Sequence, residues 1–187
     1  SGGLEEGVIT EDSTFNDTGE IKVGDYSFKN WLWVKSGQAE GFINIVHAIK
    51  RSNDVFFYRL GESLGSEKIR AWANKFGLGM KTGIELPAEV TGLVPDASWK
   101  QETKGEKWYL GDTYHMVIGQ GDVSVTPLQI NLETSIIANK GQKCDFSVLK
   151  NSKINFKNIG IDQNTIDIVK RGMVAACHSG GTAWPLF

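Results

Sequence analysis

The sequence contains few of the residues from which disulfides and metal sites are built. It has two cysteines and three histidines in 187 residues. Cys144 and Cys177 are too few for a disulfide framework or a zinc ligand set, so we expect two buried free thiols, and the redox compartment stays open. His47, His115 and His178 are scattered, with no His-x-x-x-His spacing. We therefore expect no metal and no other cofactor.

An excess of one charge is absent, and so is a long apolar run. Lysine and arginine number 20 against 22 acidic residues, and the net charge of −2 gives no reason to expect nucleic acid or an anionic membrane surface as partner. No apolar stretch is long enough to span a bilayer, and Ser1-Gly2-Gly3 does not begin a signal peptide. The composition is uniform and ordinary for a globular protein, so we expect a single domain.

Hydrophobic periodicity predicts a mixture of hairpins and helices. The first forty residues are rich in Asn-Asp, Thr-Gly and Val-Gly-Asp turns and predict short strands, with Trp31 and Trp33 packing in one of them. From Gly41 the apolar residues recur at helical spacing up to Ser52, and again from Asp54 to a glycine stop.

Capping signals predict three further helices. Ser66 is expected to cap a helix that stops at Gly77. The span 126–141 carries the clearest pattern, with a threonine cap, a proline at the first helical position and a glutamine that completes a capping box. A last helix is predicted over 164–177. The span 82–113 is irregular and predicts a long surface excursion with brief strands at most.

The first candidate site is the polar tripeptide Ser52-Asn53-Asp54, which separates two apolar helical stretches. Serine, asparagine and aspartate are preferred helix caps because their side-chain oxygens accept the free amide protons of a new helix. Local sequence alone therefore favours a structural cap over a catalytic group.

Three other strings imitate a penicillin-type serine acyltransferase, in which Ser-x-x-Lys supplies the nucleophile and a neighbouring amine. Ser147-Val148-Leu149-Lys150 matches that string, Lys81-Thr82-Gly83 matches the substrate-binding strand motif, and His178-Ser179-Gly180 resembles a variant of it. Their setting argues against all three. Ser147 follows Ser52 along the chain instead of preceding it, Lys81 lies in the irregular excursion, and the glycines after His178 are explained by a helix stop.

Longer stretches carry a more specific resemblance. The run "SNDVFFYRLGESLGSEKIRAWANKFGLGMKTGIELPAEVTGLVP" and the run "WYLGDTYHMVIGQGDVSVTPLQINLETSIIANKG", with its Gly-Gln-Gly and Thr-Pro-Leu-Gln elements, resemble the transpeptidase domain of elongation-type class B penicillin-binding proteins. "LEEGVI" near the start resembles the end of that family's nucleophile helix, and "GGTAWPLF" at the end resembles the stretch before its Lys-Thr-Gly strand.

The resemblance implies an α+β fold, namely part of the penicillin-recognising transpeptidase fold, with a helical lobe and antiparallel sheet elements, mostly helical in this chain. It implies that residues 1–187 form a single partial domain, without the nucleophile segment before residue 4 and without the Lys-Thr-Gly strand after residue 187. The chain would then hold no nucleophile of its own, and we expect it to be inactive alone. Exposed apolar faces would follow from the missing parts, with self-association as one way to cover them.

The resemblance also assigns roles to the tripeptide. Ser52 and Asp54 become catalytic candidates: Ser52 as proton relay between a lysine amine and the leaving D-alanine, Asp54 as hydrogen-bond partner of that lysine and of the stem peptide. Asn53 becomes a substrate-binding candidate. Many relatives carry asparagine where this sequence has Asp54, and a carboxylate there would favour the charged lysine. We therefore expect Asp54 to pair with the lysine at rest.

The implied reaction is acyl transfer from D-Ala-D-Ala stem peptides through a serine ester. β-Lactams and proteins of the wall-elongation machinery are the implied partners, and the implied location is extracytoplasmic, with an upstream segment anchored in the inner membrane. Two alternatives stay open: a catalytically silent homologue that acts as a scaffold, and a β-lactam sensor or β-lactamase, which the Gly-Gln-Gly and Thr-Pro-Leu-Gln elements disfavour.

Overall fold

The structure is a computed structural model that describes residues 1–184. Residues 185–187, the end of the stretch that resembles the approach to the Lys-Thr-Gly strand, lie outside the described residues. The elements are, in chain order, α1 (Gly2–Glu5), β1 (Thr14–Asp17), β2 (Glu20–Val23), β3 (Tyr26–Lys29), α2 (Trp31–Ser36), β4 (Gly41–Asn44), α3 (Ile45–Arg51), α4 (Asp54–Leu64), α5 (Ser66–Lys75), α6 (Ala97–Lys104), α7 (Leu110–Val117), α8 (Pro127–Ala138), β5 (Gln142–Cys144), β6 (Phe156–Asn158) and α9 (Gln163–Ala176).

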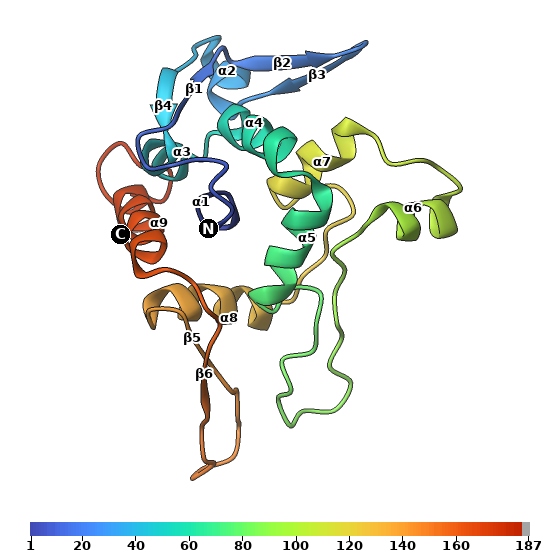
Figure 1. The fold of residues 1–187 in the computed structure, drawn as a ribbon, viewed down its shortest axis with the longest axis vertical. Helices are drawn as coiled ribbons and strands as arrows, with labels where there is room; N and C mark the ends of the chain where they lie inside the picture. The colour runs from blue at the N-terminus through green and yellow to red at the C-terminus, as the bar shows by residue number, and fades with distance from the viewer. Residues whose placement is uncertain (185–187) are drawn as a thin grey trace.

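The helices α3, α4, α5, α8 and α9 are arranged around the short α1 (Figure 1). Helices α3 and α9 lie against each other, and Gly172 of α9 permits the close approach, because a Cβ at that position would lie 2.8 Å from the Cβ of Ile49. A cavity of about 350 Å³ remains beside α1 and is lined mostly by apolar side chains, among them Ile49, Phe57, Ile137 and Met173. The interior of this body is therefore incompletely filled within the described residues.

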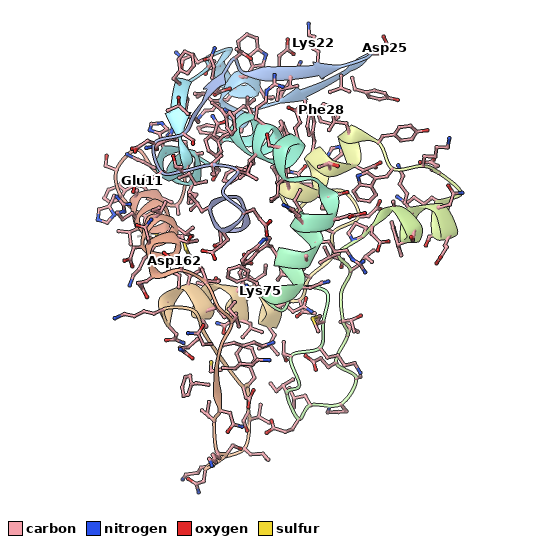
Figure 2. All side chains as sticks on the ribbon, in the orientation of Figure 1. Glu11, Lys22, Asp25, Phe28, Lys75 and Asp162 are labelled. Atoms are coloured by element: carbon pink, nitrogen blue, oxygen red, sulfur yellow. The ribbon has the colours of Figure 1, made fainter. Side chains whose placement is uncertain are left out.

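The strands form three two-stranded antiparallel ribbons in residues 1–184. β1 pairs with β4, which sets Asp17 opposite Gly41. β2 and β3 form a hairpin that projects from the helical body (Figure 1), and its Phe28 packs edge-on against Tyr58 of α4 and Tyr114 of α7 (Figure 2). Helices combined with antiparallel ribbons confirm the α+β class.

Two local predictions near the candidate site are wrong. Residues 41–44 were predicted to begin a helix but form β4, because pairing with β1 outweighs their helical spacing. Trp31 and Trp33 were predicted in a strand but belong to helix α2. Tertiary contacts explain the second difference: the Trp31 indole donates a hydrogen bond to the carbonyl oxygen of Arg51 at 2.7 Å, and Trp33 covers Gly19 so closely that a Cβ there would clash.

The helix predictions hold better where the capping signals are strong. Thr126 caps α8 as predicted: its hydroxyl accepts from the Gln129 amide, and the Gln129 side chain accepts from the Thr126 amide. Helix α5 is capped by Gly65 and begins at Ser66, one residue earlier than the predicted serine cap would place it. The excursion over 82–113 was expected to hold brief strands at most, and it contains α6 and the start of α7.

Gln129 also explains how the excursion is held. Its side-chain amide donates to the carbonyl oxygens of Met80 at 2.6 Å and Thr91 at 2.8 Å, and the residue is fully buried. One capping residue thus anchors a long irregular segment. In the part of the chain that the structure describes, no helix is both long and apolar enough to cross a membrane.

Candidate active site

The tripeptide Ser52-Asn53-Asp54 forms the junction between α3 and α4. Ser52 ends α3 in the left-handed region, with φ 49° and ψ 52°, and the Asn53 amide donates to the carbonyl oxygen of Ala48 at 2.9 Å. A left-handed conformation is costly for a residue with a Cβ, so surrounding contacts must hold it. The turn exposes Ser52, buries Asn53 completely and leaves Asp54 half-buried.

A cap was predicted from the tripeptide as a whole, and Asn53 is the residue that provides it. Its side-chain oxygen accepts the Phe56 amide at 2.9 Å and so begins α4. Its side-chain amide has a second task, which the sequence did not reveal: it donates to a carboxylate oxygen of Asp17 at 2.8 Å and to one of Glu40 at 3.1 Å. The cap is thus tied to the β1–β4 ribbon.

Asp17 is the centre of that tie and is 2% exposed. One of its oxygens accepts the Gly19 amide at 2.7 Å, and the other accepts the side-chain amide of Asn30 at 3.0 Å and the Glu40 amide at 3.1 Å, in addition to Asn53. The four donors satisfy both oxygens of this buried carboxylate. Asp17 ends β1, and nothing in its local sequence marks it as part of a site.

A second set of contacts reaches Ser52 from the residue before it. The Arg51 guanidinium pairs with Glu40 through its Nε and donates from Nη1 to the carbonyl oxygen of Gly180 at 2.7 Å, while its plane lies over the Trp31 ring. Glu40 and Arg51 are the further residues that sequence analysis missed. The only signal was their charge, which is ordinary for a protein surface.

The hydroxyl of Ser52 meets the C-terminal part of the described chain. Its Oγ lies 2.8 Å from Oγ1 of Thr182, and the Thr182 amide donates to the carbonyl oxygen of Lys50 at 3.2 Å. The segment that follows α9 therefore closes over the α3–α4 junction. Two hydroxyls within hydrogen-bond distance can pass a proton in either direction.

The pKa of the Asp54 carboxyl is raised above its ordinary range. Burial is the main cause, the negative charge of Asp17 adds to it, and a hydrogen bond from the backbone of Trp31 acts in the opposite direction. Tyr58, one turn further along α4, has a pKa raised to about 12 by burial and by the charge of Asp54. The tyrosine therefore stays neutral, and Asp54 is the group at this junction that a neighbouring cation would stabilise.

The three imitating strings lie in other settings. The Ser147 hydroxyl is hydrogen bonded to Glu85 and to Ser152, both at 2.6 Å, in the segment that links β5 to β6, at the opposite end of the long axis from β1 and β4 (Figure 1). Thr82 binds Glu89 through its amide and hydroxyl. The His178 ring contacts the carbonyl oxygen of Val174, at the end of α9. Of the three strings, the one that ends at Gly180 does reach the junction, because the Gly180 carbonyl oxygen accepts from Arg51, next to Ser52.

No metal cluster accompanies the tripeptide. Within residues 1–184, no group of three or more histidine, cysteine, aspartate or glutamate side chains is placed to hold an ion. Cys144 and Cys177 are free thiols as predicted, although each is only half-buried. What the junction can do chemically is relay protons and donate or accept hydrogen bonds, through Ser52 and Asp54.

Comparison with known proteins identifies the fold. Residues 1–185 match the family model described as the penicillin binding protein transpeptidase domain. The structure superposes on the Helicobacter pylori penicillin-binding protein PBP2, solved in complex with MreC, with a TM-score of 0.89 at 34% identity over 98% of this chain and 34% of that chain. For Pseudomonas aeruginosa PBP2 in complex with WCK 5153 the TM-score is 0.83 at 31% identity, over 98% of this chain and 43% of that chain.

The chain belongs to the penicillin-binding protein transpeptidase family. Its resemblance to the elongation-type class B members is confirmed by the relatives: the peptidoglycan D,D-transpeptidase MrdA of Acinetobacter baumannii is 34% identical over 203 aligned residues, which include 100% of this chain. Those residues are 30% of the MrdA sequence, so the chain spans about a third of the length of such a relative.

Proposed function

We propose that the chain is part of a D,D-transpeptidase that cross-links peptidoglycan stem peptides in cell-wall elongation. The observation that carries this proposal is the α3–α4 junction, which presents the Ser52 hydroxyl beside Thr182 and keeps Asp54 half-buried, in a chain whose relatives are named for this reaction. Acyl transfer divides the barrier through a serine ester, and each half requires a proton to move.

In this proposal Ser52 relays the proton between a lysine amine and the leaving D-alanine. Asp54 accepts hydrogen bonds from that lysine and from the bound stem peptide, and a nearby ammonium would offset the desolvation that raises its pKa. Asn53 has its side chain committed to Phe56, Asp17 and Glu40. Its role is therefore to shape the site, and direct substrate contact falls to its neighbours.

The nucleophile is proposed to lie in a segment that precedes residue 4, and the Lys-Thr-Gly strand in one that follows residue 187. The cavity beside α1 supports the first part, because apolar side chains from α3, α4, α8 and α9 line it and could pack against additional chain. A second copy of this chain could cover the same apolar side chains instead. Analytical ultracentrifugation tests this, because self-association makes the measured mass increase with protein concentration.

The relatives support a proposal about partners, and family resemblance supports one about location. The H. pylori PBP2 structure contains MreC, and the P. aeruginosa PBP2 structure contains WCK 5153. We propose that this chain likewise serves in an extracytoplasmic enzyme, anchored by an upstream segment, that binds D-Ala-D-Ala peptides, β-lactams and proteins of the elongation machinery. A silent scaffold is the remaining alternative, in which Ser52 and Asp54 are present without a nucleophile.

The test uses a longer protein that extends this chain upstream and downstream to the length of its relatives. We expect a fluorescent penicillin to label the longer protein covalently on a serine that precedes residue 4, and to leave the 187-residue chain unlabelled. Peptide mapping identifies the labelled serine. Label on Ser147 would overturn the proposal, and a longer protein that binds wall components without acylation would establish the scaffold.

A further inference from the structure

The side chain of Glu40 contacts the residues on both sides of Ser52. One carboxylate oxygen accepts from Arg51 Nε, and the other accepts from the side-chain amide of Asn53 at 3.1 Å. The Glu40 side chain is 11% exposed, so both contacts form away from bulk water. A single carboxylate therefore bridges the positions before and after the serine.

The bridge is fixed at its far ends. The Glu40 amide donates to Asp17 at 3.1 Å, which places the residue at the end of the β1–β4 ribbon, and Arg51 continues to the carbonyl oxygen of Gly180 at 2.7 Å. His47 is a further charged or polar neighbour, with its Nε2 3.8 Å from Glu40. Movement of the ribbon or of the segment after α9 would therefore displace Glu40 or Arg51 and, through them, the α3–α4 junction.

Ser52 needs such support because of its backbone. Its φ of 49° lies in the left-handed region, where a residue with a Cβ is held only when surrounding structure determines the conformation. With this backbone conformation the Ser52 Oγ lies 2.8 Å from Oγ1 of Thr182. Small errors in the position of a proton-transfer group reduce the rate strongly, while substrate binding changes little.

We propose that Glu40 is a positioning residue for catalysis, and that it acts by clamping Arg51 and Asn53 so that the Ser52 hydroxyl is held in its reactive direction. This inference rests on the transpeptidase function proposed above. It adds a residue outside the tripeptide, in the loop directly before β4, that touches neither the substrate nor the reacting atoms.

Glu40→Gln is the decisive substitution. The glutamine has the same size but carries one acceptor and one donor, whereas Arg51 and Asn53 both present donors to Glu40. One arm of the clamp must therefore break. The matched control is Glu11→Gln, which removes a carboxylate from the Arg171 ion pair at 2.6 Å, on the flank of α9 (Figure 2).

The measurement is the rate constant of acylation by a penicillin in the longer protein, followed together with the final labelled fraction. We expect Glu40→Gln to slow acylation about tenfold at an unchanged final fraction, since one hydrogen bond to a charged group is lost. In a Ser52→Ala background the same substitution should change the rate less than about twofold, because residues that act through one another are not additive. Glu11→Gln should leave the acylation rate unchanged both with Ser52 present and in the Ser52→Ala background.

Each outcome has a distinct meaning. Equal slowing by Glu40→Gln with and without Ser52 would overturn the inference and assign Glu40 a general structural role, as would a lowered labelled fraction with a normal rate. If Glu40→Gln does not fold, Arg51→Met breaks the other end of the clamp, and an unchanged rate in that variant overturns the inference equally. Failure of the unsubstituted longer protein to be acylated would instead remove the proposed function.

Discussion

Two serines of this chain lie in short motifs of the same enzyme class, and their surroundings differ in kind. Ser52 lies between two packed helices, its neighbours Arg51 and Asn53 bound to carboxylates of a separate ribbon. Ser147 lies half-buried in the segment between two short strands and is bound to Glu85 and Ser152. The difference teaches that buried carboxylates bound to the neighbours of a serine, and neither the local motif nor the exposure of the serine itself, distinguish the Ser52 hydroxyl from the Ser147 hydroxyl.

The acids of the two regions differ in the same way. Burial raises the pKa of Asp54, whereas the hydrogen bond from Ser147 lowers the pKa of Glu85. A nearby cation would lower the pKa of a desolvated carboxyl such as Asp54. The charged form of Glu85 is already stabilised by a hydroxyl, so a cation would change its pKa less. The comparison can be tested by substitutions made in pairs, one in each region.

The largest difference is expected in catalysis. In the longer protein, Ser52→Ala should slow acylation by a penicillin about a hundredfold, because general acid–base groups typically contribute factors of this size. Ser147→Ala should leave the rate within about twofold. Rapid-mixing fluorescence measures the acylation rate of each variant. Equal rates for Ser52→Ala and Ser147→Ala would show that the two serines do not differ in catalytic role.

The next difference concerns stability. Asn53→Ala removes a helix cap and takes one donor away from each of the Asp17 and Glu40 carboxylates, so we expect a loss of about 3 kcal/mol in the free energy of unfolding. Thr126→Ala removes a cap alone and should cost about 1 kcal/mol. Urea unfolding measures the free energy of unfolding of both variants. A loss for Asn53→Ala no larger than that for Thr126→Ala would show that the buried contacts of Asn53 contribute nothing beyond the cap.

A smaller effect should appear in the pH dependence of Asp54. Its folded-state pKa lies above the ordinary value near 3.8, so the folded state binds the proton more tightly, and stability falls as the pH rises through the folded-state pKa. Asp54→Asn should therefore be more stable than the unsubstituted chain at neutral pH. The gap should close as the pH falls below about 4. A gap that widens toward acid pH would contradict the assigned burial.

The smallest effect is expected at Glu85, and it has the opposite sign. Its folded-state pKa is lowered, so its contribution to stability is present at neutral pH and is lost as the pH falls through that pKa. Glu85→Gln should be slightly less stable than the unsubstituted chain at neutral pH and equal to it in acid. Thermal unfolding at a series of pH values checks this, with Asp54→Asn measured in parallel.

The family and the tripeptide were accessible from the sequence because both rest on contiguous residues. Capping signals at Thr126 and Asn53 also act over three or four positions, which is why they were predicted correctly. Residues 41–44 were not, since strand pairing with residues 14–17 is a long-range contact that overrides local spacing.

The partners of Asn53 were inaccessible for the same physical reason. Asp17 is separated from it by 36 positions and Glu40 by 13, and a single aspartate or glutamate at the end of a short strand has no distinguishing pattern. Trp31 shows the converse error: alternation with Trp33 suggested a strand, but the indole contact with Arg51 favours a helix at that point. Local pattern predicts local hydrogen bonds, and the site is built largely from distant ones.

The backbone of Ser52 limits which residues can occupy that position. Its φ of 49° disfavours β-branched side chains. Threonine has the same hydroxyl as serine, but its backbone would be strained at this position. Asparagine, aspartate and glycine tolerate that conformation but bring no hydroxyl. Few residues other than serine can therefore provide both a hydroxyl and this backbone conformation at position 52.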